Sequence, residues 1–308
     1  METPNQKPGI IYKKYLIKPN ISCHVHIFMI TLYHNLKNDG WHVRLFSEIL
    51  GLVETSKEII TPTLKIGEDI IKIKRFVIFQ KDEEYYIIEF QDQVNPKKLS
   101  VRHFIKNEAI KIVLKCMYRD NLYQWDKIRP FLYFEKDPHI WQKHLGYLRS
   151  GPRNVPKLYF RGTSGFGNRK NVLKKLRILN PSQKKIGLNQ YIEECRQHIM
   201  ALSLPGVANT CHREIEMFGA GIPVLMPRQK TAFYDPLIPN YHYISVDVDA
   251  KQDATDTIVS KITKRFLETY KNEALLHDIR KNALEWYDRN ILVGNRSKIT
   301  LRLLGLNG

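Results

Sequence analysis

Cysteine pairs, long apolar runs and the common nucleotide-binding glycine motifs are all missing from this 308-residue chain. Its four cysteines form no Cys-x-x-Cys pair, and their spacings indicate neither a disulfide framework nor a structural zinc site. The chain contains no run of about 18 apolar residues, so its sequence predicts no membrane-spanning helix. Residues 1–20 lack an apolar signal core, so we expect reduced thiols and a soluble, cytoplasmic protein.

Acidic residues are scarce relative to basic ones, with 31 Asp and Glu against 49 Lys and Arg, and the formal net charge is +18. This charge predicts an anionic partner, which a nucleic acid, a phosphorylated small molecule or an anionic membrane surface would each satisfy. Hydrophobic residues make up 43% of the chain, so the composition is that of a globular protein. The length fits two domains of ordinary size or one large α/β unit.

Strand and helix patterns alternate along the first half. We expect strands over 12–20 and 41–46, helices over 26–40 and 47–60, and two strands within 70–90 joined by the turn at 81–84. Residues 104–118 are ambiguous between helix and strand. The opening strand–loop–helix–strand pattern is typical of a doubly wound α/β fold.

The second half starts afresh after an expected linker at 151–156, which holds one Gly and two Pro. Helix patterns over 168–179, 190–198 and 211–221 alternate with strand patterns at 157–160, 199–206 and 222–227. We therefore expect an α/β protein of two Rossmann-like domains that face a central cleft. Their predicted ranges are 1–150 and 151–290, with a segment 291–308 that crosses back to the first domain.

The loop at 161–169 combines glycines with two arginines at the start of a predicted helix. Backbone N–H groups of Gly162 and Thr163, with the positive end of the helix dipole, suit a phosphate group. Arg161 and Arg169 would add charge-assisted contacts to a diphosphate. The loop matches neither GxxxxGK[ST] nor GxGxxG, so a basic surface turn is an equal interpretation.

A basic run follows directly, with seven Lys or Arg residues between Asn168 and Lys185. A solvated helix face is the simpler interpretation of its lysines. The alternative is a nucleic-acid patch, although the run has no aromatic residues on which single-stranded bases would stack.

The stretch 203–225, SLPGVANTCHREIEMFGAGIPVL, resembles a signature of GT-B glycosyltransferases. The resemblance implies that Glu216 binds the ribose of a nucleotide-sugar donor, while His212 and Arg213 face the diphosphate from the helix start. Many retaining GT-B enzymes carry a second Glu where this chain has Asn209. That departure argues against the retaining subgroup and favours inversion. Glu214 is expected off the inward face of the helix.

A narrower resemblance covers residues 155–290. FRG at 160–162, CHRE at 211–214, GIPVL at 221–225 and YHYIS at 241–245 occur in the order seen in exostosin-like and KTEL-motif (CAP10-like) glucosyl- and xylosyltransferases. It implies transfer of xylose or glucose from a UDP-sugar to a glycan or protein hydroxyl by a hexosyl- or pentosyltransferase. Such a site uses arginines and helix N-termini in place of a metal, and needs no cofactor beyond the donor. Asp247 and Asp249 have the letters of a metal motif but not its usual position.

An inverting transfer needs a base that accepts the proton of the acceptor hydroxyl. Asp92 follows a predicted strand, and His24 and His26 lie in the first loop between a strand and a helix, so these three are the candidates. Aromatic residues over 118–147 are either core or stacking platforms for a sugar. The competing function is a basic nucleic-acid-binding protein, and a glycosyltransferase acting on DNA would combine the two.

Overall fold

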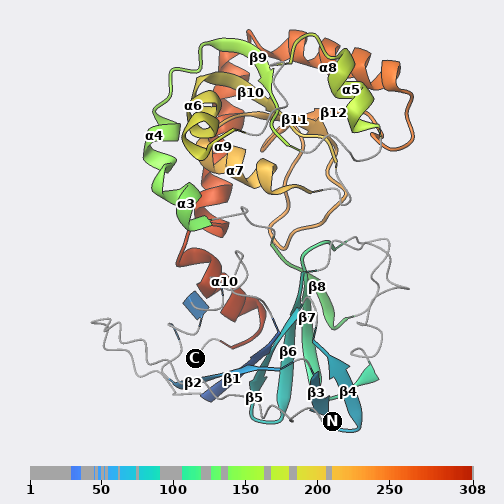
Figure 1. Ribbon diagram of the computed structural model, residues 1–308, viewed down its shortest axis with the longest axis vertical. Coiled ribbons are helices and arrows are strands. Elements are labelled where there is room, and N and C mark those ends of the chain that lie inside the picture. The colour runs from blue at the N-terminus through green and yellow to red at the C-terminus, as the bar shows by residue number, and fades with distance from the viewer. Residues whose placement is uncertain are drawn as a thin grey trace, which may run out of the picture. The chain divides into compact units, whose positions relative to one another are not determined.

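The computed structural model describes residues 29–35, 45, 48–49, 52, 55–61, 63–73, 76–90, 106–118, 126–132, 138–162, 168–179, 186–205 and 210–306. The chain forms two compact units, shown in Figure 1. Unit 1 contains Met1–Phe131 and Arg296–Gly308, and unit 2 contains Leu132–Asn295. Residues 132–150, which the sequence grouped with the first domain, cluster with unit 2. Among the helices that the structure describes, none has the length and apolar character to cross a membrane.

Unit 1 is built on a mixed sheet of six strands in the order β2-β1-β5-β6-β7-β8, beside a β3–β4 hairpin. The bounds are β1 (Met29–His34), β2 (Thr55–Ile60), β3 (Thr63–Ile66), β4 (Asp69–Lys72), β5 (Phe76–Lys81), β6 (Glu84–Glu89), β7 (Ile110–Lys115) and β8 (Ile128–Pro130). Strand β5 runs antiparallel to its neighbours β1 and β6, and the other pairings are parallel. The two strands expected within 70–90 are confirmed as β5 and β6, with Asp82 at a positive φ of 54° in the turn between them.

The helix expected over 26–40 is wrong where the structure describes it, because Met29–His34 is strand β1. Ile30, Leu32 and His34 are buried, while Thr31 and Tyr33 between them are partly exposed. That alternation has the period of a strand with one buried face. The helix expected over 47–60 is also partly wrong, since β2 occupies its second half, whereas Leu45, placed in a predicted strand, is helical. The ambiguous segment 104–118 contains strand β7.

Unit 2 has a four-stranded sheet in the order β12-β11-β10-β9, with all neighbouring strands parallel. The strands are β9 (Val155–Tyr159), β10 (His198–Leu202), β11 (Val224–Pro227) and β12 (Ile244–Val246). The helices are α3 (Pro138–Lys143), α4 (Leu145–Arg149), α5 (Arg169–Lys175), α6 (Leu188–Gln197), α7 (His212–Ala220), α8 (Thr255–Thr269) and α9 (Glu273–Asn290). The alternation of strands and helices predicted for this half is confirmed, and with it the α/β class.

Helices cover both faces of this sheet. Apolar residues of α5, α8 and the first half of α9 share one core with the strands, among them Val172, Ile262 and Ile279. Helix α7 packs against the second half of α9, where Phe218 meets the edge of Trp286 at a centroid distance of 6.1 Å. Gly219 permits this approach, because a Cβ there would lie 2.6 Å from the Tyr287 ring. Because all four strands run parallel, their carboxyl ends lie at the same edge of the sheet. This edge is where α/β proteins place their sites.

Helix α10 (Asn295–Leu303) and residues 151–156 are each tied into a unit by an arginine. Helix α10 follows α9, and the buried Arg296 donates to Glu48 of unit 1, with its Nε at 2.9 Å from the carboxylate. The expected linker at 151–156 is instead tied into unit 2. Arg153 donates to the carbonyls of Leu148, Cys195, Arg196 and Ala220, and so joins the C-terminal ends of α4, α6 and α7.

Candidate anion-binding site

The carboxyl edge of the unit 2 sheet gathers the polar residues that follow each strand. Arg161 and Gly162 follow β9, Ser203 follows β10, and Gln229 follows β11. Helices α5 and α7 begin at the same edge, so their N-terminal N–H groups and positive dipole ends lie there as well. The arrangement suits a bound anion.

Arg213, the second residue of α7, is fixed at this edge. Its Nε donates to the carbonyl oxygen of Arg161 at 2.6 Å, and its guanidinium lies over the Phe160 ring at 4.2 Å from the centroid. The residue is 9% exposed, yet within the described part of the chain its Nη1 has no hydrogen-bond partner. A buried cationic N–H group without an acceptor is costly, which makes Arg213 a candidate ligand for an anion.

Gly162 makes room for that guanidinium. A Cβ built at this position would lie 1.8 Å from Nη2 of Arg213, far inside any normal contact distance. The glycine that the sequence suggested for its backbone N–H is therefore required, in this structure, by the close approach of Arg213.

Arg161 and Arg169 were expected to contact phosphate, but both are engaged in internal contacts. Arg161 forms a two-pronged ion pair with Glu194 of α6, at 2.8 Å from Nε and 2.6 Å from Nη2. Arg169 donates to the carbonyl of Leu204 and lies 3.7 Å from the Cys211 sulfur. Burial lowers the pKa of Arg169 from its ordinary value. These two arginines secure the ends of β9 and β10.

Glu216, the expected ribose ligand, lies half-buried on α7. Its Oε2 accepts a hydrogen bond from the Tyr191 hydroxyl at 2.9 Å, and its carbonyl accepts one from Trp141 Nε1 at 3.0 Å. Tyr191 and Glu194 were not among the predicted site residues. They lie one turn apart on α6, where Tyr191 contacts Glu216 and Glu194 contacts Arg161. Their spacing of three residues was visible, but their partners are far away along the chain.

Glu214 is buried deep in the site, contrary to the expectation that it lies off the inward face. Its carboxylate accepts hydrogen bonds from the Ser203 hydroxyl at 2.7 Å, from Gln229 Nε2 at 3.2 Å and from the backbone N–H of Cys211. The last bond is half of a capping box, formed by the third residue of α7. Burial raises the pKa of Glu214 to about 7, although these donors and the nearby arginines favour the charged form.

The hydrogen bonds around Glu214 also extend to β12. The backbone N–H of Gln229 donates to the Tyr243 hydroxyl at 3.0 Å, just before β12. Glu214 and Gln229 thus connect the ends of β10 and β11 with the start of β12 and the first turn of α7. They hold the α7 N-terminus in a defined position relative to the sheet.

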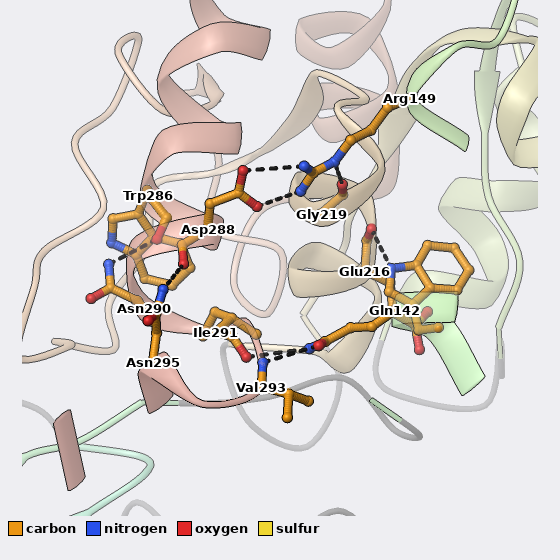
Figure 2. A network of polar contacts seen from close by, with 11 residues as sticks. Gln142, Arg149, Glu216, Gly219, Trp286, Asp288, Asn290, Ile291, Val293 and Asn295 are labelled. Atoms are coloured by element: carbon orange, nitrogen blue, oxygen red, sulfur yellow. Dashed lines mark hydrogen bonds and ion pairs between the residues drawn. The ribbon is translucent and has the colours of Figure 1, made fainter. Parts of the chain in front are cut away.

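Helix α7 is also held at its other end, as Figure 2 shows. Arg149 donates from Nε to the Gly219 carbonyl at 2.9 Å and pairs with Asp288 of α9. Gln142 of α3 donates to the Ile291 carbonyl and accepts from the Val293 N–H at 3.0 Å, beyond the end of α9. Cationic groups at the C-terminal end of a helix complement its dipole. The Arg149 bond holds the C-terminal end of α7, while the Gln142 bonds hold the residues that follow α9.

Of the other predicted site residues, the structure describes only His212. His212 is the first residue of α7 and is partly exposed at the edge. Five predicted residues lie outside the described residues, namely His24, His26, Asp92, Thr163 and Asn209.

The two aspartates that resemble a metal motif follow β12. Asp249 pairs with Lys230 at 2.8 Å, and hydrogen bonds from Lys230 and from the Lys251 backbone lower its pKa. Within the described ranges, no group of three His, Cys, Asp or Glu residues has the arrangement of a metal site. In the aromatic segment, Trp141 is only 3% exposed and packs near Tyr191 at a centroid distance of 5.7 Å, which makes it a core residue.

Comparisons with known proteins find similarity only among solved structures, since no family model and no curated protein matches the chain. A crystal structure of WaaG, a glycosyltransferase involved in lipopolysaccharide biosynthesis, is 13% identical over 65% of this chain and 64% of that chain, with a TM-score of 0.39. A glycosyltransferase from Rickettsia africae ESF-5 is 13% identical over 69% of this chain and 68% of that one, with a TM-score of 0.42. The matched region therefore spans about two thirds of each solved protein.

Proposed function

We propose that the chain is a glycosyltransferase of the GT-B type whose unit 2 binds the diphosphate of a nucleotide-sugar donor. The observation that carries this proposal is Arg213, a buried guanidinium held at the start of α7, whose Nη1 finds no hydrogen-bond partner among the described residues. The resemblance of residues 203–225 to GT-B donor signatures supplies the ligand class.

The chemistry follows from charge. A leaving nucleoside diphosphate concentrates negative charge on its phosphates, and fixed donors stabilise that charge without reorganising during the reaction. Arg213 and the α7 N–H groups supply these donors. Tyr191 holds one oxygen of the Glu216 carboxylate, and the other oxygen would accept a hydrogen bond from a ribose hydroxyl.

The finer assignments belong to the same proposal and rest on the sequence resemblance. The donor is a UDP-sugar, with xylose or glucose transferred to a glycan or protein hydroxyl, by inversion and without a metal or further cofactor. Asp92, His24 and His26 are the candidate bases for the acceptor hydroxyl.

Isothermal titration with UDP and GDP tests the donor site directly. We expect the wild-type protein to bind at least one of them, and Arg213→Ala to weaken that binding about tenfold or more, since a charged hydrogen bond contributes about 1.5–3 kcal/mol. Lys281→Ala, which removes an exposed charge from α9, serves as the control and leaves affinity unchanged. No binding of either nucleotide, or equal binding by Arg213→Ala, contradicts the proposal. A screen for slow hydrolysis of nucleotide sugars then identifies the sugar.

A further inference from the structure

Basic residues are segregated along the chain. No Asp or Glu occurs between Asp137 and Glu193, a stretch that includes α3, α4, β9, α5 and the start of α6. Such a one-signed segment gives its part of unit 2 a positive field unless its charges are neutralised by other elements.

Several of these cationic side chains form ion pairs or donate hydrogen bonds within unit 2. Arg149 pairs with Asp288, Arg161 pairs with Glu194, and Arg153 donates to helix-end carbonyls. Lys175 turns toward α8 and pairs with Asp256 at 2.7 Å. These residues do not form an anion-binding surface.

Three of the remaining exposed cations lie on α5 or directly after it, and they are defined here as the basic strip: Lys170, Lys174 and Arg177. Lys170 and Lys174 lie one turn apart on α5, about 6 Å between Cβ atoms. Arg177 follows the end of α5, where the chain runs along the edge of β9 and the Leu158 N–H donates to the Ile178 carbonyl at 2.9 Å. The neighbouring Lys175 pairs with Asp256, whereas no ion pair of the described residues includes any of these three cations.

We propose that the basic strip binds the phosphate backbone of a double-stranded nucleic acid. Cations spaced along one helix and the segment directly after it match a repeating array of phosphates. The strip has no aromatic residue for stacking on single-stranded bases. It also has no exposed apolar side chain, and stable binding to a membrane usually needs an apolar anchor besides charge.

The three cations set the expected salt dependence. With about three phosphates neutralised, log affinity falls against log salt with a slope of about −2.7. Raising salt from about 50 to about 200 mM then weakens binding by about 40-fold. Sequence has little effect, because contacts to phosphate carry no base identity.

Fluorescence anisotropy with a labelled duplex of about 20 base pairs, measured over this salt range, tests the proposal. We expect Lys170→Gln/Lys174→Gln to reduce the slope by about 2, and the matched variant Lys264→Gln/Lys281→Gln, with the same charge removed from α8 and α9, to keep most of the wild-type slope. Equal effects of the two variants, or a flat slope for the wild type, overturn the proposal. Binding to anionic vesicles of phosphatidylserine and phosphatidylcholine that depends on Lys170 and Lys174, without duplex binding, overturns it in favour of a membrane.

Titration of UDP and GDP into the same variants separates this proposal from the proposed function. The strip variants retain nucleotide binding because neither lysine contacts Arg213 or Glu214. If Lys170→Gln/Lys174→Gln loses duplex binding but keeps nucleotide binding, the result supports the basic strip as a separate site. If the wild-type protein binds neither nucleotide, the result refutes the donor site and leaves the basic strip standing.

Discussion

Replacing Gly162 by Ala perturbs the proposed donor site through a single methyl group. The added Cβ would lie 1.8 Å from Nη2 and 3.0 Å from Cζ of Arg213, so the guanidinium must move by more than an ångström. Movement breaks its 2.6 Å bond to the Arg161 carbonyl and its stacking on Phe160. A side chain end moves more readily than a backbone, so unit 2 should remain folded.

The size of the effect follows from what Arg213 provides. A charged hydrogen bond contributes about 1.5–3 kcal/mol, and the cation–π contact that orients the guanidinium adds about 1 kcal/mol. A guanidinium displaced from its bound position should therefore lose about 2 kcal/mol of nucleotide binding, a factor of about 30 in Kd. Isothermal titration with UDP or GDP measures this loss, and thermal unfolding checks that the fold persists.

Gly146→Ala in α4 is the matched control, because a Cβ there meets no atom within 4 Å. We expect it to bind like the wild type. In an Arg213→Ala background, Gly162→Ala should have no additional effect, since the group it displaces is already absent. Wild-type affinity for Gly162→Ala, or full additivity with Arg213→Ala, would refute the assignment of Arg213.

Two further predictions concern the stability of unit 2. Arg153→Met leaves the four carbonyls at three helix ends without their donor and should lower the free energy of unfolding by about 3–5 kcal/mol in denaturant titration, whereas Lys157→Met changes it little. The pKa of Glu214 is raised to about 7, so its stabilising contribution is complete below about pH 4.5 and falls by about 3 kcal/mol as the pH rises through 7. Glu214→Gln should remove this slope, and an unchanged difference between pH 5 and pH 8 would contradict it.

The periodicity of the second half was sufficient to predict most of unit 2. The strand and helix patterns from 157 to 227 follow local rules, with β10, α7 and β11 separated by turns, and these predictions are confirmed. In the first half, β1 was mistaken for a helix because its short apolar run resembles both periods. Pairing with β2 and β5, both distant in sequence, decides it.

The sequence by itself determined the net charge, the alternation of strands and helices in unit 2, and the segments from which the site is built. Only the tertiary structure decided which partner each of the charged groups takes. Arg161, Arg169 and Arg213 look alike in sequence, but Glu194 lies 33 residues from Arg161 and Leu204 lies 35 residues from Arg169. Their chemical roles depend on partners brought together by folding, since local patterns carry no information about which buried atoms find an acceptor.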